Sequence, residues 1–95
     1  MRISEHQKKV ILDEVHAIDA NARVILFGSR VDDNARGGDI DLLIISDLIG
    51  FREEMKIRTR IMDQIGWQKL DLIVQRRDET APPIVALALE TGVPL

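Results

Sequence analysis

Residues 27–45 read FGSRVDDNARGGDIDLLII, and this stretch determines both the expected fold and the expected chemistry. Asp39 and Asp41 stand at the entrance of an aliphatic run, and the pair Gly28-Ser29 ends the preceding one. Strand side chains alternate between faces, so Asp39 and Asp41 project from one face, about 6.5–7 Å apart along the chain. Two like charges in this position repel each other. The pattern therefore indicates a site that recruits a cation.

The apolar pattern around this stretch predicts three strands. Residues 22–27 (ARVILF) form a short β-branched run that ends at Gly28. Residues 40–45 are apolar on both faces, which is typical of a central strand. Residues 70–74 (LDLIV) form the third strand. The polar residues 30–38 between the first two strands are expected in a loop or a short helical turn, with Asp32 and Asp33 in solvent.

Capping residues and apolar spacing predict three helices. The first is capped by Ser4 and runs to about Ile18. The second is capped by Ser46 or Asp47 and ends near Ile65. Its apolar stripe is expected to hold Phe51, Met55, Met62 and Ile65. The third follows Pro82-Pro83, spans about 84–90 and stops at Gly92. This last helix is apolar around much of its circumference, which fits either a core helix or a protein interface.

The connections between strands suggest the topology. A short link favours antiparallel pairing of the first two strands, and the helical crossover favours parallel pairing of the second and third. We therefore expect an α+β fold with a small mixed three-stranded sheet flanked by helices, as one domain over residues 1–95.

Composition limits the functional classes. The chain has 95 residues, a net charge of −3 and no cysteine, so thiolate metal sites and disulfides are excluded. No segment has the apolar length of a signal peptide or a membrane span, and we expect a cytoplasmic protein. The acidic balance gives no support to direct nucleic-acid binding.

A third carboxylate completes the predicted metal site. Asp71 lies inside the apolar run LDLIV, and pairing of the second and third strands brings it beside Asp39 and Asp41. Unit charges 4 Å apart repel by on the order of 4 kcal/mol at an effective dielectric constant of 20. Oxygen ligands of this kind suit hard divalent cations such as Mg²⁺. The sequence therefore predicts a metal site of three aspartates.

The residues after the first strand predict a phosphate site. Gly28 lets backbone amides approach a ligand closely, and a helical turn beginning at Ser29 would offer free amides and a hydroxyl to phosphate. Arg30 either adds positive charge or lies on the surface. A phosphate site opposite a metal site is typical of enzymes that bind nucleoside triphosphates, in which two metal ions serve the attacking and leaving oxygens.

These residues resemble a known family. The stretch LFGSRVDDNARGGDIDLLI, the later LDLIV and the ending ALETGVPL resemble the minimal nucleotidyltransferases of the DNA polymerase β superfamily, closest to the MNT antitoxin partners of HEPN toxins. The resemblance assigns Gly28 and Ser29 to the triphosphate. It assigns Asp39 and Asp41 to the metals, and Asp71 to the catalytic metal and the incoming hydroxyl.

The resemblance also implies a reaction. A hydroxyl attacks the α-phosphorus of a nucleoside triphosphate, most simply ATP with Mg²⁺, and pyrophosphate leaves. In the antitoxin branch the acceptor is a tyrosine of the HEPN toxin, whose RNase is thereby silenced. Two alternatives stay open: an antitoxin that acts by binding alone, and a nucleotidyltransferase that modifies a small-molecule hydroxyl.

Several other residues are not assigned to the site. His6 and His16 lack partners at metal-ligand spacing and are expected at the surface or at its boundary with the core. Trp67 is expected in the core. Arg58 falls on the apolar stripe of the second helix, where it would reach either the carboxylates or a partner protein.

Overall fold

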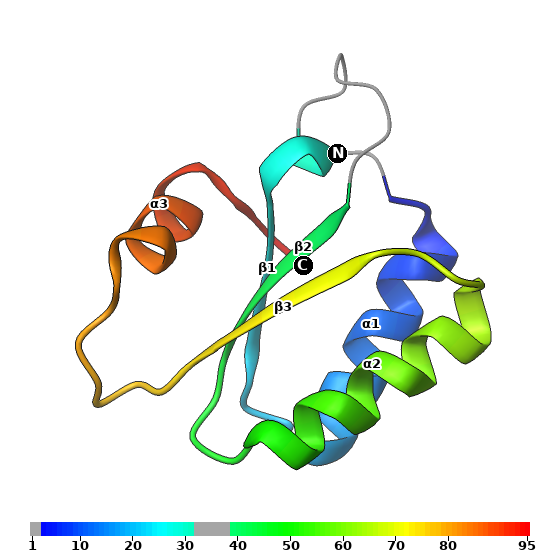
Figure 1. Ribbon diagram of the computed structural model, residues 1–95, viewed down its shortest axis with the longest axis horizontal. Coiled ribbons are helices and arrows are strands. Elements are labelled where there is room, and N and C mark those ends of the chain that lie inside the picture. Colours follow the sequence, from blue (N-terminus) through cyan, green and yellow to red (C-terminus); the bar gives the residue numbers. More distant parts are fainter. Residues whose placement is uncertain (1–2, 32–38) are drawn as a thin grey trace.

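The computed structural model describes residues 3–31 and 39–95 (Figure 1). Asp32, Asp33 and the pair Gly37-Gly38 therefore lie outside the described residues. The helices are α1 (Glu5–Ile18), the short 3₁₀ helix η1 (Gly28–Val31), α2 (Phe51–Ile65) and α3 (Pro83–Thr91). The strands are β1 (Arg23–Phe27), β2 (Ile40–Ile45), β3 (Leu70–Gln75) and β4 (Val93–Pro94).

The strands form one mixed sheet with the order β3-β2-β1-β4. β1 is antiparallel to β2 and to β4, whereas β2 and β3 are parallel. The α+β fold and the three predicted strands are thus confirmed. The prediction of only three strands was wrong, because β4 adds a fourth strand against Leu26 and Ile25. Two residues, one of them a proline, are too short a run to show a strand pattern.

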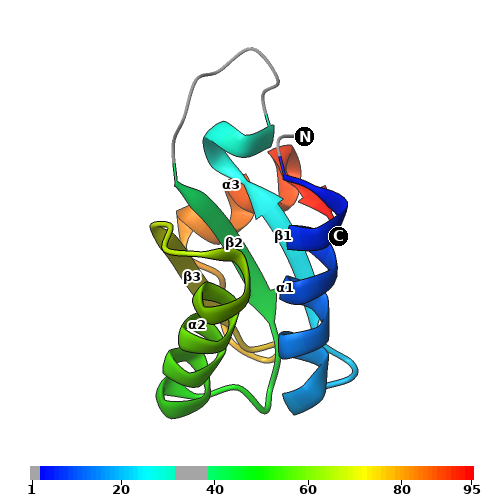
Figure 2. The same cartoon turned by 90° about the vertical axis from the view of Figure 1, so that its right-hand side faces the viewer.

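Helices cover both faces of the sheet, unequally. Helices α1 and α2 lie side by side on one face, and α3 lies on the other (Figures 1 and 2). Alternate residues of β2 divide between the two cores: Leu42 and Ile44 pack on the α1/α2 side, and Leu43 and Ile45 on the α3 side. Because odd-numbered residues of β2 face α3, Asp41 lies on the α3 face of the sheet.

Helix α1 begins as predicted. The Ser4 hydroxyl accepts a hydrogen bond from the backbone N–H of Gln7 at 3.0 Å, and the Gln7 side chain accepts one from the N–H of Ser4 at 2.9 Å. This reciprocal capping box satisfies two of the free amides at the helix start.

Helix α2 differs from the prediction in its cap and in its buried face. Gly50, rather than Ser46 or Asp47, is the N-cap, and its N–H donates to Glu53 Oε1 at 2.9 Å. The buried residues are Ile57 and Ile61. Phe51 and Met55, which were expected in the core stripe, are 77% and 53% exposed. Helical spacing alone could not decide which of two adjoining apolar stripes faces the sheet.

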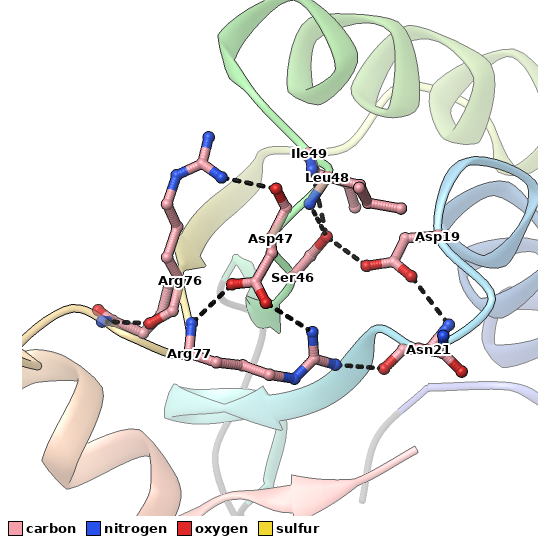
Figure 3. A network of polar contacts seen from close by, with 9 residues as sticks. Asp19, Asn21, Ser46, Asp47, Leu48, Ile49, Arg76 and Arg77 are labelled. Carbon is pink, nitrogen blue, oxygen red and sulfur yellow. Dashed lines mark hydrogen bonds and ion pairs between the residues drawn. The ribbon is translucent and has the colours of Figure 1, made fainter.

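Ser46 has a different role, at the end of β2 opposite the aspartates. Its hydroxyl donates to Asp19 Oδ2 at 2.6 Å and accepts from the N–H groups of Leu48 and Ile49 (Figure 3). Asp19 also accepts from the N–H of Asn21 at 2.9 Å. Both Ser46 and Asp19 are buried, so this network joins the end of α1 to the end of β2.

A second set of contacts joins the ends of β2 and β3. The Asp47 carboxylate accepts a hydrogen bond from the backbone N–H of Arg77 at 2.9 Å, and the Arg76 guanidinium donates to the Asp47 carbonyl at 2.6 Å (Figure 3). The Arg77 guanidinium also contacts Asp47 Oδ2 at 3.3 Å. The turn after β3 is therefore held by polar contacts.

Two further expectations are revised. Trp67 is 82% exposed, so the prediction of a core residue was wrong. It follows Gly66, whose φ of 86° ends α2 and turns the chain outward before the next buried residue, Leu70. Arg58 pairs with Glu54, one turn earlier on α2, at 3.6 Å. Its Nε is buried without a hydrogen-bond partner among the described residues.

His6 and His16 are exposed, as predicted. His16 Nε2 lies 3.0 Å from the carbonyl oxygen of Ala22. Within the described ranges, the helices are all too short or too polar to cross a membrane.

Candidate active site

Three aspartates converge at one end of the sheet. Asp41 pairs with Asp71 in the parallel register of β2 and β3, and Asp39 immediately precedes β2. Each residue offers one carboxylate oxygen, and these three oxygens all lie within 4.8 Å of one another. All three residues are half-buried on the α3 face. The predicted convergence of Asp39, Asp41 and Asp71 is confirmed.

The cluster is electrostatically unfavourable without a cation. Burial, together with the adjacent carboxylates of Asp71 and Asp39, raises the pKa of Asp41 from its usual 3.8 to about 6. Lys69 opposes this effect. Ionised oxygen ligands gathered so closely are those that hard divalent ions bind. The three aspartates therefore fit a divalent metal ion and would hold it between β2 and β3.

Gly28 is required beside this cluster for two physical reasons. It has a φ of 76°, a backbone conformation that side chains rarely adopt. In addition, a Cβ atom at this position would overlap Asp41 Oδ2. The end of β1 and the Asp41 carboxylate are therefore in direct apposition, as expected if both belong to one site.

The family model for the nucleotidyltransferase domain matches residues 8–84. The chain belongs to the nucleotidyltransferase family. The matched residues run from α1 into the start of α3 and contain Gly28 and all three aspartates. A search of curated proteins finds no match to the chain.

In this nucleotidyltransferase, Ser29 and Arg30 lie in η1 directly after Gly28. Their backbone position matches the predicted helical turn at Ser29. The assignment of Gly28, Ser29 and Arg30 to triphosphate binding remains a prediction.

Sequence reasoning missed one cation beside the aspartates. Lys69 Nζ lies 3.5 Å from Asp39 Oδ2, and the lysine side chain is 67% exposed. Lys69 precedes Asp71 by two residues, so strand alternation carries both side chains to the same face. That spacing is a signal that could have identified it. In such an exposed position the pair contributes little to stability, and its effect is to lower the negative potential of the cluster.

Sequence reasoning also missed an apolar cavity of the nucleotidyltransferase domain next to Gly28. It has a volume of about 360 Å³ and is lined by Phe27, Gly28, Val31, Ile84, Leu87 and Thr91. The wall formed by α3 comes from residues distant in the sequence from Gly28, and no local pattern places them there. A smaller cavity of about 200 Å³ lies between α1 and α2, on the opposite side of the sheet.

Proposed function

We propose that this nucleotidyltransferase transfers a nucleoside monophosphate, AMP from ATP in the first instance, to a hydroxyl group, with Mg²⁺ bound by Asp39, Asp41 and Asp71. The observation that supports this most strongly is the convergence of the three carboxylates beside Gly28. Three carboxylates at this distance serve no stabilising purpose on their own.

The reaction forms one bond and breaks one bond at the α-phosphorus. The acceptor oxygen bonds to the α-phosphorus, and the bond from the α-phosphorus to the bridging oxygen of the pyrophosphate breaks. The acceptor proton passes to a carboxylate oxygen of Asp71, and pyrophosphate leaves from the side of Gly28 and Ser29. When bound, the metal ions neutralise phosphate charge and lower the pKa of the acceptor hydroxyl.

We further propose that the acceptor is a tyrosine of a HEPN toxin and that the protein acts as its antitoxin. This proposal rests on the sequence resemblance, and the exposed apolar side chains support a protein partner. Four lie on or beside α2: Leu48, Phe51, Met55 and Trp67. Phe51 and Met55 lie one turn apart on α2, and adjoining exposed apolar side chains are typical of protein interfaces.

An antitoxin that neutralises by binding alone is the second candidate, favoured by the same exposed side chains. The two candidates differ in what Asp41→Asn does. Loss of neutralisation with retained binding to the toxin supports nucleotide transfer. Full neutralisation by the variant supports binding alone.

The direct test incubates the protein with the product of the neighbouring gene, the proposed HEPN partner, ATP and Mg²⁺, and weighs that partner by intact mass spectrometry. We expect a gain of whole AMP units with the wild type and none with Asp39→Asn or Asp41→Asn. Asp63→Asn is the matched control, because Asp63 is an exposed acid on α2 outside the site. Absence of a mass gain with wild-type protein that binds Mg-ATP would exclude transfer to that partner.

The protein interface is tested separately. Phe51→Gln removes an exposed apolar side chain at the start of α2. We expect weaker HEPN binding at unchanged Mg-ATP affinity. Arg52→Gln, at the next exposed position of α2, is the matched control. Equal binding by all three proteins would place the interface elsewhere.

A further inference from the structure

We propose that the cavity between the end of β1 and α3 receives the nucleobase of the nucleoside triphosphate, with little preference among the four common bases. We call this cavity the base pocket, defined by Phe27, Gly28, Val31, Ile84, Leu87 and Thr91. The inference rests on the proposed function in that it takes the substrate to be a nucleotide.

The position of the base pocket follows from the order of the strands. Asp71 is on β3, Asp41 is on the central strand β2, and Gly28 ends β1. The base pocket lies at Gly28, on the side of the site away from Asp71. If Asp71 takes the proton of the acceptor, the acceptor approaches from the β3 side. The β1 side is then left for the nucleotide, with its phosphates at Gly28 and its base beyond them.

The size and lining of the base pocket suit a flat aromatic group. Its volume of about 360 Å³ lies at the lower end of the range for small-molecule sites, which is about 300–1,000 Å³. Phe27, a core residue that is 9% exposed, lines one side of the base pocket, and Ile84 and Leu87 offer aliphatic groups from α3. Ile84 and Leu87 are 44% and 52% exposed, so the contact surface is accessible without unfolding the helix.

The lining also predicts weak selectivity. Among the lining residues that the structure describes, none carries a charge or an amide. The polar side chain there is Thr91, whose hydroxyl already donates to the carbonyl oxygen of Leu87 at 2.8 Å. Bases differ mainly in their hydrogen-bonding edges, and an apolar pocket distinguishes such edges poorly. The base pocket should therefore bind the aromatic ring of the nucleobase and make little use of its hydrogen-bonding edge.

The test measures binding without any acceptor. Isothermal titration calorimetry compares Mg-ATP with Mg-tripolyphosphate, which lacks the nucleoside, for the wild type and for the double variant Ile84→Gln/Leu87→Gln. Leu89→Gln is the matched control, since Leu89 is 44% exposed on the same helix and does not line the pocket. Glutamine keeps the helix propensity and adds no charge that would act on the phosphates.

We expect the double variant to bind Mg-ATP about tenfold more weakly or worse, the scale of lost apolar contact in a pocket, with unchanged tripolyphosphate affinity. Leu89→Gln should match the wild type. For the wild type, the dissociation constants of ATP, GTP, CTP and UTP should agree within about tenfold, whereas a site that reads hydrogen-bonding edges separates them by about 10⁴-fold.

Four results would overturn the inference. The first is wild-type ATP affinity in the double variant, and the second is equal loss of ATP and tripolyphosphate binding. The third is a preference for one base above about tenfold. The fourth is a wild-type protein that binds no nucleoside triphosphate. The first result, if it came with a loss of AMP transfer in the double variant, would assign the pocket to the acceptor. By contrast, normal ATP binding without transfer would defeat the proposed function and leave the base pocket standing.

Discussion

Gly28 and Asp41 lie so close together that a single Cβ atom added to the glycine would overlap the carboxylate. The two residues are adjacent across the antiparallel pair, because Phe27 is the register partner of Asp41. The sheet thus fixes Gly28, which is expected to contact the triphosphate, relative to Asp41, which is expected to bind the metal. This relationship gives the site its sharpest mutational test.

Gly28→Ala should damage the site as well as the backbone. Alanine at a φ of 76° is strained by about 1–2 kcal/mol, and the added methyl group displaces the Asp41 carboxylate. We expect Mn²⁺ binding, followed by electron paramagnetic resonance, to weaken by about 10–100-fold. Gly66→Ala is the control, with a φ of 86° and nothing within 4 Å of the added Cβ. It should lose similar stability and keep Mn²⁺ affinity, and equal Mn²⁺ affinity in both variants would contradict the prediction.

Asp41→Asn should stabilise the metal-free protein at neutral pH. Burial and the neighbouring carboxylates raise the pKa of Asp41 to about 6. The folded protein therefore holds the proton more tightly than the unfolded chain, and this group favours folding at low pH but costs stability as the pH rises from about 4 to above 6. We expect a gain on the order of 1 kcal/mol at pH 7.5, after allowance for solvent screening.

Urea unfolding in EDTA at pH 5 and pH 7.5 measures this effect. Added Mg²⁺ should stabilise the wild type and have little effect on Asp41→Asn. Loss of stability in the variant at pH 7.5 without metal would show that Asp41 is favourably paired instead.

Ser46→Ala should destabilise the far end of the sheet without touching the site. It removes the hydroxyl that donates to buried Asp19 and that accepts from Leu48 and Ile49. We expect the free energy of unfolding to fall by about 2–3 kcal/mol at pH 7, because a hydrogen bond to a buried charged group contributes more than one between neutral groups. Ser4→Ala, which removes only an exposed cap, should cost about 1 kcal/mol.

The Ser46 effect should depend on pH in a defined direction. The hydrogen bond from Ser46 holds the pKa of Asp19 below its usual 3.8, against the opposing effect of burial. Its stabilisation is therefore present above that pH and is lost as the pH falls further. A cost for Ser46→Ala that stays constant from pH 7 to pH 2 would argue against an ionised Asp19 in the folded protein.

Trp67→Gln should leave the free energy of unfolding almost unchanged. The side chain is 82% exposed, so we expect a change within about 0.5 kcal/mol. Leu70→Ala, three residues later and 3% exposed, should cost about 2–5 kcal/mol. Because Trp67 is the sole tryptophan in the sequence, acrylamide quenching reports its exposure directly. A protected indole in the protein without a partner would contradict the structure.

The site was more predictable than its surroundings. Asp39, Asp41 and Asp71 could be brought together from sequence, because strand alternation fixes their face and the helical crossover makes β2 and β3 parallel. The inward face of α2 could not be predicted in this way, because two adjoining apolar stripes, one with Ile57 and Ile61 and one with Phe51 and Met55, fit the helical spacing equally well. The base pocket could not either, because it depends on how α3 packs against the end of β1.

The polar network around Ser46 shows the same division. A serine that follows a strand and precedes a helix is predicted to be the N-cap of that helix, because serine is a favoured N-cap residue. Its actual partner, Asp19, is 27 residues away in the sequence. Contacts of that range are set by the assembled sheet and leave no periodic signal in the chain.

The pairing of Asp41 with Asp71 also has a consequence for how the chain finds its native alignment. Leu70 and Leu72 pack under the sheet against α1 and α2, on the face opposite Asp71. If β3 shifted by one residue, the Asp71 carboxylate would enter that apolar core, and Leu70 and Leu72 would turn to the α3 face of the sheet. The Asp71 charge, which is electrostatically unfavourable in the folded site without a metal, thus disfavours a shifted register of β3. A correctly folded molecule therefore has its metal-ligating carboxylates already in place.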